Sequence, residues 1–66
     1  MSEGLEQLSE RLEAIAEELA DLAIEALRES IDADLPERAA DERRITKARR
    51  AVERAVALLS EPAREG

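Results

Sequence analysis

Four basic side chains recur at helical spacing in the second half of this 66-residue chain. Arg43, Lys47, Arg50 and Arg54 are separated by 4, 3 and 4 residues, so on a helix they share one face. A row of cations on a helix can contact successive phosphates of DNA or RNA. One hypothesis for this chain is therefore a small nucleic-acid-associated regulator whose phosphate-contacting residues form this basic stripe.

Two properties of the whole chain weigh against that hypothesis. The 17 acidic and 10 basic residues leave a net charge of −7, which repels a polyanion. The chain also has no Phe, Tyr or Trp that could stack on a base. We therefore interpret the basic stripe as a solvated helix face and keep nucleic-acid binding as the weaker alternative.

Acidic side chains are frequent in the first half, but the residues that usually act with them in catalysis are missing. The chain has no His and no Cys, so none of its Ser or Thr hydroxyls has an imidazole to activate it. Its two glycines, Gly4 and Gly66, cannot make a phosphate-binding loop. The sequence predicts a protein that is not an enzyme, with no catalytic residues, no metal site and no cofactor.

The elements that carry these residues are predicted by apolar spacing. A seam that repeats every 3 and 4 residues predicts a helix over residues 3–31. It comprises Leu5, Leu8, Leu12, Ile15, Leu19, Leu22 and Ala26. A turn is expected at 32–34. Asp34 and Glu37 have the spacing of a capping box, and Pro36 lies in the first turn of the helix that follows, where proline is tolerated. A second helix is expected over 35–60, followed by a frayed tail at 61–66 because Pro62 disfavours helix before it.

The second helix has a matching seam at the same spacings. It comprises Ile45, Ala48, Val52, Ala55 and Leu59. Because the linker between the helices is short, the two seams should pair antiparallel. The predicted fold is all-α, a single helical-hairpin domain over residues 1–66.

The hairpin leaves apolar residues that its own second helix cannot cover. Six of residues 37–44 are charged and the other two are Ala, so they offer no large apolar residue to the end of the first helix. The surplus residues form a predicted self-association or partner interface, comprising Ala20, Ile24, Leu27, Ile31, Val56 and Leu58. We expect two hairpins to dimerise through it into a four-helix bundle. The alternative is that the same residues dock an accessory subunit onto a larger, different protein.

The two halves of the chain differ in charge. Residues 1–35 hold 11 acids and 2 bases, a net of −9, whereas residues 36–66 hold 6 acids and 8 bases, a net of +2. This asymmetry favours contact between unlike helices, with Glu25 expected to lie across from Arg44. Such pairs affect the choice of partner more than stability.

Localisation is predicted from what the sequence does not contain. No apolar run approaches the roughly 18–20 residues of a membrane span. The first residues lack the basic start and apolar stretch of a signal peptide. We expect a cytoplasmic, acidic protein without membrane contact. Its predicted role is self-association and protein–protein interaction.

Overall fold

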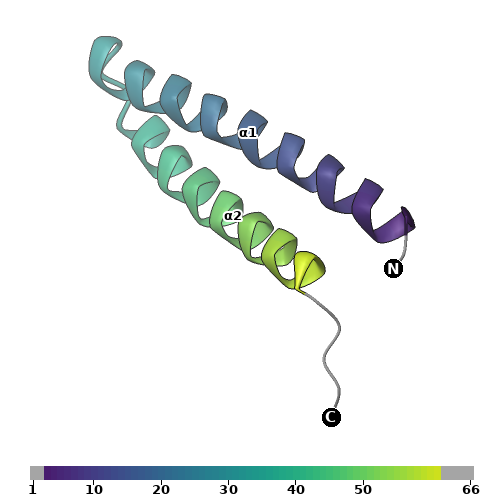
Figure 1. Cartoon of the computed structure of the whole chain (residues 1–66). Helices are drawn as coiled ribbons and strands as arrows, with labels where there is room; N and C mark the ends of the chain where they lie inside the picture. The colour runs from purple at the N-terminus through teal and green to yellow at the C-terminus, as the bar shows by residue number, and fades with distance from the viewer. Residues whose placement is uncertain (1–2, 62–66) are drawn as a thin grey trace.

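The computed structural model describes residues 3–61 and forms a hairpin of two long helices. Helix α1 spans Glu3–Asp32 and helix α2 spans Pro36–Ser60. Figure 1 shows α2 running back beside α1, with the first turns of α1 projecting past the end of α2. The predicted all-helical fold of two packed helices is confirmed. Most of the expected tail at 61–66 lies outside the described residues.

The turn between the helices is built differently from the prediction. Leu35 caps α2 in an extended conformation without any side-chain hydrogen bond, so the capping box of Asp34 and Glu37 is wrong. Asp34 instead adopts a left-handed conformation with φ 55°, which Asp tolerates better than most residues. Leu35 is extended because it precedes Pro36, and α2 therefore starts at Pro36 rather than at 35. The chain reverses through residues 33–35.

The helices meet along a line of small residues. Ser9, Ala16, Ala23 and Ala26 are the buried residues of α1, and α2 has none. We call these four residues the contact line. Ala26 also belongs to the predicted seam, but the other three do not. Of the remaining seam residues, Leu12 and Leu19 are half-buried, while Leu5, Leu8, Ile15 and Leu22 are exposed. Small side chains let two helix backbones approach closely, so the hairpin packs through them and rotates the large residues outward.

On α2 the residues closest to α1 are only half-buried. Ile45, Val52 and Leu59 belong to the predicted seam and are half-buried, whereas Ala48 from the same seam is exposed. Val56 is half-buried as well. Within residues 3–61, no side chain larger than that of Ala or Ser is buried.

The hairpin is a single layer of helix. Its principal extents are 52 × 22 × 10 Å, and its radius of gyration is 15.6 Å. A compact domain of this length would have a radius of gyration of about 11 Å. Stable domains usually consist of at least two packed layers. Both broad faces of this layer are therefore open.

An ion pair joins the two helices near the turn. The Arg38 guanidinium donates to Glu29 of α1 at 2.7 Å and to Asp41 of α2 at 2.8 Å. These hydrogen bonds raise the pKa of Arg38 above its usual value, and the bond to Glu29 contributes more than the bond to Asp41. Arg38 therefore stays charged at ordinary pH. Arg44 pairs with Asp41 on its own helix at 3.5 Å, and not with Glu25 as predicted.

Enlarging the contact line should destabilise the hairpin. Ala26 is fully buried against α2, so Ala26→Leu forces the helices apart and should cost about 1–3 kcal/mol of unfolding free energy. Ala14→Leu is the matched control, because Ala14 lies on the same helix and is exposed. Urea unfolding followed by circular dichroism at one protein concentration measures both. Equal stabilities of the two variants would contradict the small-residue packing.

Removing the Arg38 bridge should loosen the turn end. We expect Arg38→Ala to lower the thermal midpoint by a few degrees, because it breaks the ion pair that joins α1 to α2. Arg43→Ala is the control, since Arg43 is exposed and takes part in none of the ion pairs found in residues 3–61. If Arg43→Ala lowers the midpoint as much as Arg38→Ala, the bridge does not hold the turn.

Candidate interaction surfaces

The contact line divides α1 into two flanks that can be read directly from the sequence. Successive helical residues are rotated by about 100°, so the residues before and after a contact residue lie on opposite sides of the contact. On α2 the half-buried Ile45, Val52 and Leu59 serve as the same reference. The hairpin therefore has one face made by the preceding residues and one made by the following residues.

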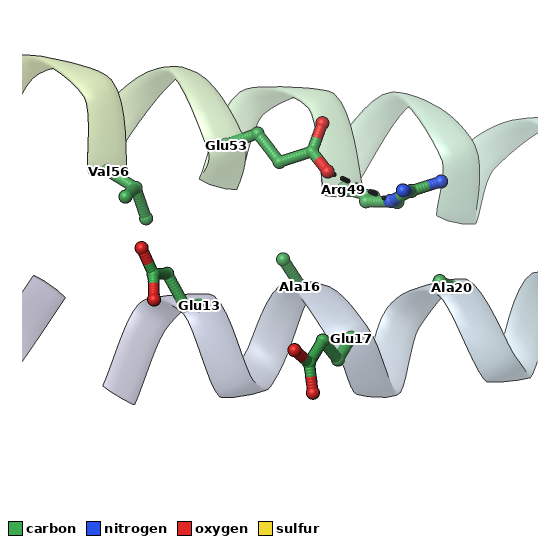
Figure 2. Close-up of a pocket in the computed structure, with 7 residues that line it drawn as sticks. All are labelled: Glu13, Ala16, Glu17, Ala20, Arg49, Glu53 and Val56. Carbon is green, nitrogen blue, oxygen red and sulfur yellow. Dashed lines mark hydrogen bonds and ion pairs between the residues drawn. The ribbon is translucent and has the colours of Figure 1, made fainter. Parts of the chain in front are cut away.

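One of these faces carries an open depression of about 330 Å³. We call it the pocket face. Its lining residues are Glu13, Ala16, Glu17, Ala20, Arg49, Glu53 and Val56. Figure 2 shows Ala16 and Ala20 of α1 and Val56 of α2 projecting into the space between the two helices. Glu17 follows the contact residue Ala16 and Glu53 follows Val52, which assigns the following residues of both helices to this face.

The charge of the depression disfavours an anionic ligand. It has three carboxylates and one guanidinium. That guanidinium, on Arg49, donates to Glu53 at 3.1 Å, and Figure 2 marks this bond. Because three carboxylates surround a single cation that is itself paired, the depression has a net negative charge over an apolar floor, which disfavours binding of a phosphate or carboxylate.

Near the turn the pocket face becomes apolar. Ile24, Leu27 and Ile31 follow Ala23, Ala26 and Ser30 respectively, and all three are exposed, Ile31 to 69%. We call these three residues the turn-end stripe. Two other members of the predicted interface, Ala20 and Val56, are half-buried in the depression between the helices.

The opposite face carries three large residues of the predicted apolar seam. Leu8, Ile15 and Leu22 precede Ser9, Ala16 and Ala23, and each is 44–47% exposed. On α2 the corresponding flank consists mainly of Ala residues, with Arg44 at the turn end and Leu58 at the other end. We define the seam face by these residues together: Leu8, Ile15 and Leu22 of α1 with Ala48, Ala51, Ala55 and Leu58 of α2.

The structure therefore separates residues that the sequence placed in one interface. Leu58, 62% exposed, lies on the seam face near the end of α2. Ile24, Leu27 and Ile31 lie on the other face near the turn, and Ala20 and Val56 lie between the helices. The signal that would have found the seam face is the line of small residues at intervals of seven, Ser9, Ala16 and Ala23.

The basic stripe lies on the outer side of α2. Arg43, Lys47, Arg50 and Arg54 are all exposed, and none takes part in the ion pairs found in residues 3–61. The structure keeps the four cations in a row along one helix and brings no other element against them.

The described residues also bear on metal binding and on membrane insertion. In the part of the chain that the structure describes, no set of three or more acidic side chains is arranged to hold a metal ion. Neither α1 nor α2 has the length and apolar character that crossing a membrane requires.

Comparison of the chain with protein-family models, with curated proteins and with solved structures finds no match.

The basic stripe should not bind nucleic acid on its own. Four exposed cations could neutralise a few phosphates, but the net charge of −7 opposes the approach of a polyanion. We expect no shift in the fluorescence anisotropy of a labelled duplex or single strand at roughly 50 mM salt. Binding that weakens with added salt and is lost in Arg50→Glu would contradict this expectation.

Proposed function

We propose that this chain functions through protein–protein association, as a non-catalytic helical module that pairs with a second copy of itself. One observation carries the proposal: many of the large apolar side chains lie on the solvent-exposed surface of the hairpin and not between its helices. Nine of them are exposed, and no side chain larger than that of Ala or Ser is buried within residues 3–61.

The energetics of a lone hairpin support association. Burying a large aliphatic side chain contributes about 1.5–3 kcal/mol, and the hairpin leaves most of that contribution unused. A chain of this length has a small core in any case. It has no Cys for disulfides and no His for a zinc site, two common means of stabilising small domains. A second layer of helices would bury the exposed residues.

A pair of hairpins is the smallest assembly that supplies this layer. Two single-layer hairpins stacked face to face make a four-helix bundle, in which each helix buries its apolar stripe in a shared interior. The absence of His and Cys and the solvated carboxylates leave surface recognition, not catalysis, as the activity of such a bundle.

Sedimentation equilibrium tests the proposal. Between roughly 5 and 200 μM we expect a species of twice the 7.3 kDa chain mass, which dissociates on dilution and loses helical circular dichroism as it does so. A helical monomer of 7.3 kDa throughout this range, with a melting temperature independent of concentration, would overturn it.

A further inference from the structure

We infer that the second copy docks on the seam face, with both turns at the same end of the bundle, so that α1 of each copy lies on α2 of the other. This inference rests on the proposed self-association and specifies its surface and its orientation. Three observations carry it: the sizes of the side chains on the seam face, the charge difference between the helices, and the composition of the opposite face.

Symmetry limits the arrangements to two. Two identical layers stacked face to face can be related by a two-fold axis that runs along the helices or by one that runs across them. The axis along the helices places both turns at the same end and stacks α1 on α2 of the second copy. The axis across them places the turns at opposite ends and stacks α1 on α1 and α2 on α2.

Side-chain size favours the first arrangement. On the seam face α1 presents large residues, Leu8, Ile15 and Leu22, whereas α2 presents mainly small ones, Ala48, Ala51 and Ala55. Large residues that face small ones interdigitate at the density of a protein interior. The second arrangement would place large residues against large ones on one side of the bundle and Ala against Ala on the other.

The ion pair at the turn gives the approximate levels at which these residues meet. Oε1 of Glu29 and Nε of Arg38 are 2.7 Å apart, so equal steps back along α1 and forward along α2 reach residues at about the same height. Leu22 is then level with Ile45, Ile15 with Val52, and Leu8 with Leu59. An axis along the helices preserves height, so Ile15 comes opposite Ala51 of the second copy, Leu22 comes between Arg44 and Ala48, and Leu8 comes opposite Leu58.

Charge favours the same arrangement. The half of the chain that contains α1 has a net charge of −9, and the half that contains α2 has +2. On the outer rim of the seam face α1 carries Glu18 and Glu25. Stacking α1 on α2 brings Glu18 and Glu25 to within about two residues, roughly 3 Å along the axis, of the heights of Lys47 and Arg44 of the second copy. Stacking α1 on α1 would bring acidic helices together, and this repulsion discriminates against the second arrangement.

The pocket face is less suited to a second copy. Over most of its length it carries carboxylates, including Glu13, Glu17 and Glu53, and its large apolar residues are confined to the turn-end stripe. A two-fold axis would place two such acidic surfaces against each other. Glu53 is paired with Arg49, but Glu13 and Glu17 take part in none of the ion pairs found in residues 3–61, and burying unpaired carboxylates is costly.

Two matched substitutions test the choice of face. Ile15 and Ile24 are the same residue type on the same helix, 44% and 51% exposed, on opposite faces. We expect Ile15→Glu to raise the dimer dissociation constant at least about 100-fold, because each dimer loses the contact twice. Ile24→Glu should leave it within about threefold. Sedimentation measures both, and circular dichroism records whether helix is lost together with the dimer.

Spin labels test the orientation. Because the chain has no Cys, Asp32→Cys provides a single labelling site at the turn end of α1. Pulsed electron–electron resonance should give a label separation below about 30 Å when the turns share one end, and about 40 Å or more when they do not. Arg50→Cys, near mid-height of the hairpin, is the control that should report a short distance in either arrangement.

The outcomes separate this inference from the proposal it depends on. A monomer in sedimentation overturns both. A dimer that survives Ile15→Glu but dissociates with Ile24→Glu moves the interface to the pocket face and overturns the inference alone. A dimer with a short distance at Arg50→Cys and a long one at Asp32→Cys overturns the orientation. Dissociation by Ile15→Glu only, with short distances at both sites, supports the inference.

Discussion

The close approach of two helices along a line of small side chains is the constraint on which the rest of this structure depends. Ser9, Ala16, Ala23 and Ala26 bring α2 against α1, and Ala26 is completely buried there. Large residues on the contact line would hold the helices apart, so the hairpin places them on its flanks. The result is a single layer of helix with open apolar surface and a very small core of its own.

Charge acts on a different property, the choice of neighbour. Helix α1 is acidic and the half of the chain that contains α2 is mildly basic, so α1 is repelled less by α2 than by the α1 of a second chain. Arg38 shows this in the hairpin, where one guanidinium joins Glu29 of α1 to Asp41 of α2. Exposed pairs of this kind contribute little free energy, but they exclude arrangements in which like charges meet. The apolar residues supply the stability of the proposed dimer, and the charges select its arrangement.

Much of the fold could be predicted because it depends on local signals. Apolar spacing indicated both helices, and Pro36 and Pro62 indicated where α2 starts and ends, since proline restricts the residue before it. The capping box failed because Asp34 took a left-handed turn conformation in place of a capping one. The predicted seam was identified from its large apolar residues. The contact line was missed because close helix packing favours small residues, which give a weak hydrophobic signal in the sequence. The predicted interface was divided for the same reason, since its members lie on different sides of that line.

The sequence by itself determined that this chain forms two helices, where they reverse, and that they differ in charge, because these properties depend on residues near one another in the chain. Only the tertiary structure decided which side of each helix turns inward. A rotation of one residue about the helix axis exchanges a row of Leu and Ile for a row of Ala and Ser. Apolar periodicity alone does not distinguish the two rows, whereas the distance between packed backbones does. That choice turned Leu8, Ile15 and Leu22 of the predicted seam toward the open face of the hairpin, while Ala26 stayed inside.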